Sequence, residues 1–261
     1  MRVRLRPIAL PAEHGGWGLL FEPIVLGMSL APSLVGLLIS VTATGLFLAR
    51  HPFKLAVGDW RRHRRSARSG LALRFALLYF VIGTLALAFA IKTGGAGFLL
   101  PLIFAAPSAL IQLFHDSVGR SRTLMAELAG AVSTGAVATA IVLAGGWPRP
   151  AAFGLWAVLA ARTVPTILYL RARLRLLHRK PASPREVIIA HVLALLIVSG
   201  LAWASALPFL AIVALTILLL RAALGFAGFD KRVTAKRLGF RELCFGALTV
   251  FTVFLGHALG W

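Results

Sequence analysis

Two carboxylates and a histidine near the start of the chain have the side chains needed for acid–base chemistry. Glu13 and His14 lie where an apolar stretch begins, and Glu22 lies eight residues further along it. In a helix, this spacing places Glu22 two turns, about 12 Å, deeper in the apolar stretch. Because an ionisable group at that depth needs a partner, we interpret these three residues as candidate catalytic groups. A glutamate that only locks two helices together is the alternative.

Arg162 is the second deep charge. It precedes Arg171, which marks the end of its apolar segment, by nine residues, and that segment is expected to run opposite to the one holding Glu22. The two side chains therefore reach a similar depth. We predict a Glu22–Arg162 contact at the floor of a cavity, and a purely structural ion pair is the alternative.

Further charged side chains lie at the ends of the apolar segments and could bind an anionic group. Guanidinium groups match the oxygens of phosphate and diphosphate, and a helix that begins near Thr123 would add free amide groups. For Arg61 to Arg68 we prefer a different interpretation, a loop resting on acidic lipids. The predicted substrate-binding residues are Arg50, His51, Lys54, Asp59, His115, Asp116, Arg120, Arg122, Glu127, Arg162, Arg171 and Arg175.

Metal-binding residue types are present without a metal motif. His115, Asp116 and Glu127 carry groups that bind divalent ions, but their spacing matches no known ligand pattern. No metal is therefore predicted in the site, and Mg²⁺ is left open as a cofactor. The single cysteine, Cys244, excludes an internal disulfide.

The composition predicts an all-α membrane protein. Of the 261 residues, 59% are hydrophobic, and the mean hydropathy is +0.87, so the apolar length exceeds what one soluble core would bury. We predict one transmembrane domain over residues 1–261, with a basic arm at 1–12. About nine apolar segments have spanning length: 15–31, 33–49, 71–91, 95–114, 123–143, 149–170, 186–206, 208–225 and 240–260.

The distribution of charge predicts the orientation. Nearly all of the 28 Lys and Arg residues fall in the N-terminal arm and in loops on one side, whereas Lys92 and Arg149 lie on the other side. The N-terminus and long loops are therefore expected in the cytoplasm of a bacterial inner membrane, with Trp261 outside. The formal net charge of +20 falls in clusters between apolar runs, which favours the lipid bilayer rather than nucleic acid as partner. All acids fall in cytoplasmic loops or the inner half of a segment, which favours a cytoplasm-facing polar cavity over simple neutralisation of basic loops.

The opening motif resembles that of a known family. Pro11-x-Glu13-His14-Gly15-x-Trp17, with Pro23 and Gly27 following, is similar to the start of the YwiC-like family of uncharacterised bacterial membrane proteins. The resemblance continues through Arg50-x-Pro52, residues 120–130, residues 169–175 and residues 237–242. It implies a membrane protein and supplies no established activity.

A weaker resemblance is to the UbiA-type intramembrane prenyltransferases. These enzymes use nine helices with the N-terminus inside, and their turn after the fourth helix carries a basic pair followed by spaced glycines. Arg120, Arg122, Gly130 and Gly135 are similar to that turn. The resemblance implies an isoprenoid diphosphate substrate, held through Mg²⁺ by Asp-rich motifs in the second and sixth inter-helix loops.

This chain departs from the UbiA pattern in those two loops. The first contains Asp59 as its one aspartate, and the second contains Arg171, Arg173 and Arg175 instead of aspartates. The set of aspartates that binds Mg²⁺ in the UbiA-type enzymes is therefore not present in these two loops.

Two functional hypotheses follow. The first is an intramembrane enzyme acting on an isoprenoid diphosphate or another anionic, lipid-soluble substrate, with arginines binding the anion and Glu22 or Glu13 as base or cation stabiliser. The second is a transporter or binding protein for a small anion or a lipid. Outer loops that are nearly empty of polar groups favour the enzyme. A scaffold without chemistry is a third reading.

Overall fold

The computed structural model describes residues 5–11, 14–63, 67–228 and 234–260, and for His14 the backbone alone. All regular elements in these ranges are helices. In chain order they are α1 (Arg6–Ala9), α2 (His14–Leu30), α3 (Leu34–Arg61), α4 (Ala67–Gly94), α5 (Leu99–Ser117), α6 (Leu124–Ala144), α7 (Arg149–Leu177), α8 (Pro184–Trp203), α9 (Leu210–Phe226) and α10 (Ala235–Leu259).

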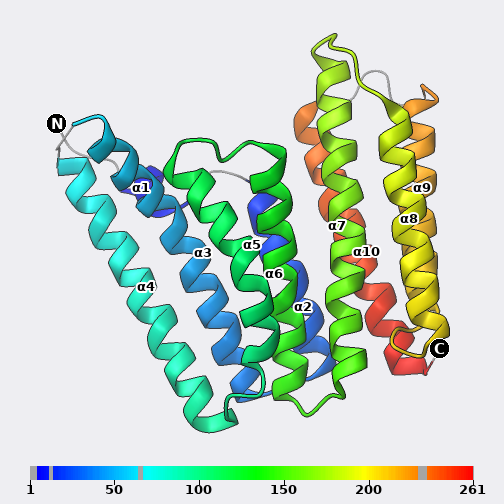
Figure 1. The fold of residues 1–261 in the computed structure, drawn as a ribbon, viewed down its shortest axis with the longest axis horizontal. Coiled ribbons are helices and arrows are strands. Elements are labelled where there is room, and N and C mark those ends of the chain that lie inside the picture. Colours follow the sequence, from blue (N-terminus) through cyan, green and yellow to red (C-terminus); the bar gives the residue numbers. More distant parts are fainter. Residues whose placement is uncertain (1–4, 12–13, 64–66, 229–233, 261) are drawn as a thin grey trace.

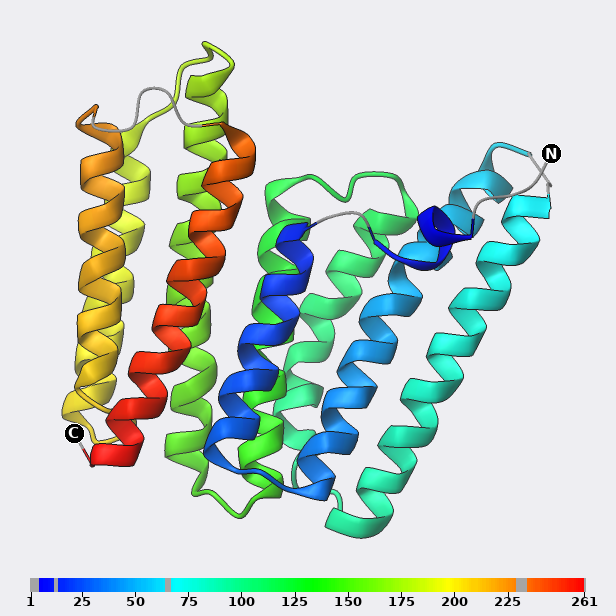
Figure 2. The same cartoon turned by 180° about the vertical axis from the view of Figure 1, so that it is seen from behind.

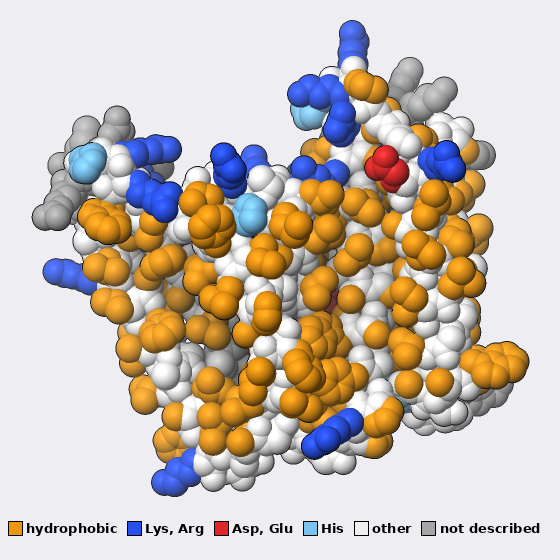
Figure 3. Space-filling view, in the orientation of Figure 1, with side chains coloured by type: hydrophobic (Ala, Val, Ile, Leu, Met, Phe, Trp, Pro, Cys, Tyr) orange, Lys and Arg blue, Asp and Glu red, His pale blue; other side chains and the backbone are white. Residues whose placement is uncertain are grey.

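The long helices lie side by side and alternate in direction (Figure 1). α1, the end of α3, the start of α4 and the α5–α6 and α7–α8 connections lie at one end, which we call the basic end because it holds Arg61, Arg122 and Arg175. The α2–α3, α4–α5, α6–α7 and α8–α9 turns and the C-terminus lie at the other (Figure 2). Charged side chains gather at the basic end in Figure 3. This arrangement is the string of helical hairpins that alternating short turns and basic loops require.

The flanks of the bundle are strongly apolar (Figure 3). Large side chains such as Leu85, Phe89 and Phe104 are each about 60% exposed, and many others on α4, α5 and α8 resemble them. Such a surface is unfavourable in water and suits the hydrocarbon core of a bilayer. The chain is therefore an integral, multi-pass helical membrane protein.

Among the described residues, seven helices have the length and hydropathy to cross a membrane: α3, α4, α5, α6, α7, α8 and α10. They correspond to seven of the nine predicted segments. Segments 15–31 and 208–225 form the apolar but shorter helices α2 and α9.

Several helices extend beyond the predicted segments, and α3 and α7 extend furthest. α3 continues to Arg61 and α7 to Leu177, because Arg, Lys and Leu favour helix. α3 continues although its extension contains Pro52 and Gly58. The cationic stretches that begin at Arg50 and Arg171 were expected in loops, and that placement was wrong. Their side chains project from helices and are held more rigidly than loop residues would be.

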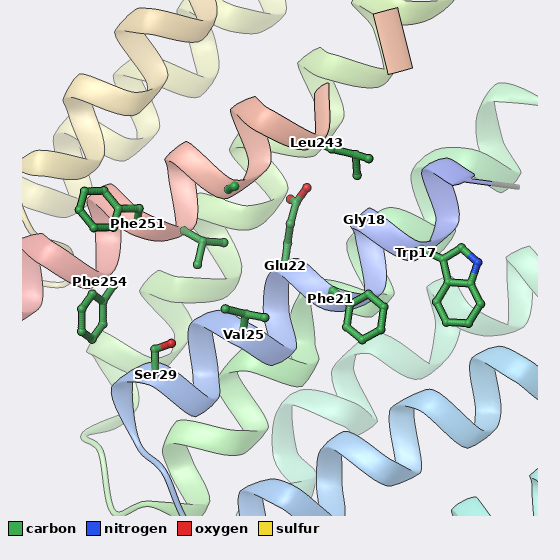
Figure 4. A pocket seen from close by; sticks show the side chains of 11 residues that line it. Trp17, Gly18, Phe21, Glu22, Val25, Ser29, Leu243, Phe251 and Phe254 are labelled. Atoms are coloured by element: carbon green, nitrogen blue, oxygen red, sulfur yellow. The ribbon is translucent and has the colours of Figure 1, made fainter. Parts of the chain in front are cut away.

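α2 is positioned by α6 on one face. A Cβ atom added at Gly27 would lie 2.9 Å from Cβ of Ile141 on α6, so the two helices approach closely and a larger residue would push them apart. Leu26 and Val142 belong to the buried core that also includes α7, α8 and α9. The opposite face of α2 is turned toward α10, and Glu22 lies there (Figure 4).

Candidate functional site

Four charged side chains from four helices form a buried cluster, which we call the charge network: Glu22 on α2, Arg162 on α7, Arg221 on α9 and Glu242 on α10. Arg162 Nη2 lies 3.1 Å from Glu22 Oε1 and donates to the backbone carbonyl of Glu242 at 2.7 Å. Arg221 Nη1 donates to Glu242 Oε1 at 2.5 Å. The four side chains are between 4% and 10% exposed. The predicted Glu22–Arg162 contact is confirmed.

Neutral groups from α7, α8 and α10 surround Arg221. Its Nη2 donates to Thr166 Oγ1 at 3.3 Å and lies 3.3 Å from His191 Nε2. Its guanidinium carbon lies 4.2 Å from the centre of the Tyr169 ring and 5.3 Å from that of Phe245. Stacking on an aromatic face suits a planar guanidinium, which loses little hydration there. Arg221 on α9 is therefore held in place by side chains from α7, α8 and α10.

A glycine on α10 makes room for the charge network. A Cβ atom at Gly246 would collide with Glu22 Oε1 and would lie 2.7 Å from Arg162 Nη2. The carboxylate thus lies against bare backbone, and the absence of a side chain at this position lets α2 and α7 reach the same point of α10.

The charge network is incompletely satisfied. Within the described part of the chain, Glu22 Oε2, Glu242 Oε2, Arg162 Nε and Arg221 Nε have no hydrogen-bond partner. Most buried polar atoms in proteins are paired, and clusters of exceptions gather where a site has a role beyond stability. Apolar side chains of similar volume would give equal or greater stability at this depth. These two arguments favour a functional role for the network.

A cavity of about 590 Å³ lies between α2 and α10, and we call it the α2–α10 groove (Figure 4). Its walls are mainly apolar and include Trp17, Phe21, Phe251 and Phe254. Phe21 is 47% and Phe251 57% exposed on the flank of the bundle, so the groove opens toward the bilayer. Glu22 is the charged residue in its lining, and it therefore belongs both to the groove and to the charge network.

A second, smaller pocket lies nearer the basic end. It has a volume of about 40 Å³ and is lined by Arg50, His51 and Lys54 of α3 together with Gly16 and Phe47. We call it the basic pocket. Two of its basic side chains are already bonded. Arg50 forms an ion pair with the buried Asp116 on α5, and His51 Nε2 lies 3.1 Å from the carbonyl of Pro7.

A third group joins α6 and α7 at the basic end. Arg171 Nη1 donates to Glu127 Oε2 at 2.8 Å and to the carbonyl of Arg122 at 3.1 Å. The Arg171 and Glu127 side chains are 39% and 35% exposed. Thr123 caps the start of α6, since its Oγ1 accepts from the amide of Ala126 at 3.4 Å.

The remaining predicted binding residues lie apart from these three groups or make local contacts. Arg120 is exposed, His115 Nδ1 lies 2.8 Å from the carbonyl of Ile111 on its own helix, Asp59 accepts from Ser69 at 3.1 Å, and Arg175 donates to the carbonyl of Pro181 at 3.0 Å. Glu13 and the side chain of His14 lie outside the described residues, so their catalytic roles stay predictions.

The described residues expected in one cytoplasm-facing polar cavity are thus divided among three places. Glu22 and Arg162 lie in the charge network, Arg50, His51 and Lys54 in the basic pocket, and Arg171 with Glu127 at the α6–α7 contact. The large cavity is apolar rather than polar. No group of three or more His, Cys, Asp or Glu side chains in the described ranges is placed to hold a metal ion.

Sequence reasoning missed the second half of the charge network. Arg221 falls within the apolar segment 208–225 but was counted with the cytoplasmic loop bases, and that assignment was wrong because its side chain is 9% exposed. Glu242 and His191, which contact Arg221, were not among the predicted site residues either. An arginine five residues inside an apolar segment was the signal available, because such a charge is a candidate site in its own right.

Comparison with known proteins gives one match. None of the curated proteins and none of the solved structures compared with the chain matches it, so the UbiA resemblance stays a prediction. A family model described as YwiC-like protein matches residues 10–142. The match includes the opening motif, every residue that lines the basic pocket and α6 as far as Val142, and it ends before residues 169–175 and 237–242. On this match over half of its length, the chain belongs to the YwiC-like family.

Proposed function

We propose that the protein takes up a lipid-soluble molecule from the bilayer and binds it in the α2–α10 groove. The observation that carries this proposal is the combination of an apolar cavity of about 590 Å³, an opening on the lipid-facing flank and a single carboxylate in its lining. Binding sites for small molecules are commonly apolar cavities of this size with a few convergent polar groups.

The proposal includes the orientation in the membrane. We take the nine helices from α2 to α10 as spans of a bacterial inner membrane, with the basic end in the cytoplasm because Lys and Arg are in excess there. The 17 residues of α2 and of α9 give helices of about 25 Å, near the lower limit for a span. In this orientation, the groove lies within the hydrocarbon region and Trp17 lies toward its cytoplasmic edge.

A lipid-binding role agrees better with the lining of the groove than anion binding does. Among the described residues that line the groove, there is no Lys, Arg or His. Two of the arginines expected to bind a phosphate, Arg50 and Arg171, are engaged by Asp116 and Glu127. A diphosphate would have to displace these carboxylates before it gained the same contacts.

A transferase acting on an isoprenoid diphosphate is the second candidate, and one observation favours it. Gly16 lines the basic pocket and Trp17 lines the groove, while the ring of Trp17 lies 5.2 Å from that of Phe47 between them. An isoprenoid chain in the groove would thus bring its head group near Arg50, His51 and Lys54. Phosphate would then be held by guanidinium and imidazole groups as the sequence predicts.

Photolabelling of the purified protein tests the proposal. A long-chain hydrocarbon probe with a diazirine group should label α2 and α10, with the modified peptides located by mass spectrometry. Ala247 lines the groove and is exposed, so Ala247→Phe should fill the groove and remove most of the labelling. Ala88→Phe is the matched control, because Ala88 is an exposed residue of α4 that does not line the groove.

Equal labelling of the two variants on α2 and α10, with both proteins folded, would refute binding in the groove. Labelling restricted to the lipid-facing side of α4 and α5 would also contradict it, since those exposed apolar flanks do not line the groove.

A further inference from the structure

We infer that the molecule bound in the α2–α10 groove is an alcohol, with a long apolar body and an uncharged hydroxyl group that donates to the Glu22 carboxylate. The inference rests on the proposed function and adds to it the chemical class of the ligand. Three properties of the groove lead to it: the polarity of its lining, the bonding state of Glu22 and the charge of the network behind Glu22.

The groove offers hydrogen-bond acceptors rather than positive charge. Its polar side-chain groups are the Glu22 carboxylate, the Ser29 hydroxyl and the indole N–H of Trp17 near one end, and the rest of its described lining is glycine, alanine and larger apolar residues. A carboxylate accepts hydrogen bonds and does not donate them, whereas a serine hydroxyl does both. A ligand that satisfies Glu22 must therefore bring a donor.

Glu22 has acceptor capacity that its own neighbours do not use. Arg162 Nη2 lies 3.1 Å from Oε1, and the same nitrogen also donates to the Glu242 carbonyl. Oε2 has no hydrogen-bond partner in the described residues, although Glu22 is only 9% exposed. A carboxylate can accept about four hydrogen bonds, so Glu22, which lines the groove, keeps acceptor capacity for a ligand donor beside its ion pair with Arg162.

The charges behind Glu22 favour an uncharged donor. Arg162 already compensates Glu22, and Arg221 compensates Glu242, so the network is formally neutral. An ammonium group would add uncompensated positive charge at membrane depth, and a phosphate would face a carboxylate. A hydroxyl group supplies the missing hydrogen bond at a much smaller desolvation penalty.

The closing experiment uses competition among matched molecules. Four long-chain compounds that share one hydrocarbon chain and end in hydroxyl, methyl, ammonium or phosphate compete with the diazirine hydrocarbon probe on the intact protein. We expect the alcohol to compete about tenfold or more better than the methyl-terminated chain, because a hydrogen bond to a charged acceptor has that effect. The ammonium and phosphate compounds should compete less well than the alcohol.

Two variants test the role of Glu22. Glu22→Gln keeps an acceptor oxygen without charge and should reduce the preference for the alcohol. The double variant Glu22→Leu with Arg162→Met removes both charges together and should abolish that preference while the hydrocarbon probe still labels the groove. Thermal unfolding in detergent verifies that each variant is folded.

The outcomes separate the inference from the proposed function. If all four compounds compete equally, or if phosphate or ammonium competes best, the groove binds lipid but the alcohol assignment is overturned. If no compound reduces labelling of α2 and α10 in the native protein, the groove is not a binding site and both proposals are overturned. If the phosphate-terminated compound competes with the probe in the native protein but not in Arg50→Gln or Lys54→Gln, the diphosphate candidate would be supported instead.

Discussion

Two ion pairs on helix α7 have similar geometry and opposite surroundings. Arg162 lies 3.1 Å from Glu22, and Arg171, nine residues further along, lies 2.8 Å from Glu127. The first pair has side chains 4% and 10% exposed, whereas the second has side chains 39% and 35% exposed. Distance alone would rank the second pair higher. Burial, and not distance, decides how much the free energy of unfolding falls when one partner of each pair is removed.

The contrast follows from solvation. At the basic end, water screens the Arg171–Glu127 attraction and rehydrates either partner when the other is removed. Inside the bundle, removal of one partner leaves the other charge without water or counter-charge. Deep pairs are thus retained either because the fold has come to depend on them or because they have a function. The opening of the groove beside Glu22 favours function.

The largest effect is expected for Arg162→Met. Loss of this guanidinium leaves the Glu22 carboxylate without its buried partner and the Glu242 carbonyl without a donor. We expect the free energy of unfolding to fall by about 3–5 kcal/mol. Chemical or thermal unfolding in detergent measures the change. A variant as stable as the native protein would show that the contrast between the two pairs is wrong.

The next largest effect is expected for Gly246→Ala. The added methyl group would collide with Glu22 Oε1 and approach Arg162 Nη2, and overpacking of this kind lowers stability by about 1–3 kcal/mol. Gly200→Ala on α8 is the control, because a Cβ atom there meets nothing within 4 Å and alanine favours helix by about 1 kcal/mol over glycine. The two alanines should shift the unfolding temperature in opposite directions, and a shared direction would contradict the close approach at Gly246.

The smallest effect is expected for Glu127→Gln. Its partner Arg171 keeps a bond to the Arg122 carbonyl and is partly hydrated, so the loss of stability should be less than about 1 kcal/mol. The difference from the native protein should shrink further in high salt. A salt-independent loss as large as that of Arg162→Met would mean that the basic end is as dry as the charge network.

The overall architecture followed from features that the chain displays locally. Apolar length, turn residues and the one-sided excess of Lys and Arg indicate a string of membrane helices, because each reflects a local preference of the chain for lipid or water. The Glu22–Arg162 contact followed from matched depth on two antiparallel helices. That inference needed the direction in which each helix crosses the membrane, and it needed no knowledge of which helices pack together.

The rest of the site depends on which helices are neighbours. Arg221 and Glu242 meet because α9 and α10 pack beside α7, and nothing in their spacing along the chain indicates this. The groove lies between α2 and α10. A glycine is required at position 246 because a Cβ atom there would collide with Glu22 Oε1. The prediction that these residues line a single polar cavity was wrong, because residues at the same depth or at the same end of the bundle need not line the same cavity.

The central claim is that Glu22 forms the polar wall of a lipid-accessible site and is not only a structural lock. The most direct measurement is competition by the long-chain alcohol in the double variant Glu22→Leu with Arg162→Met, with the unfolding temperature recorded on the same sample. We predict near-native stability, because the buried charges are removed together, with loss of the alcohol preference. A stable double variant that retains the full preference would contradict the claim.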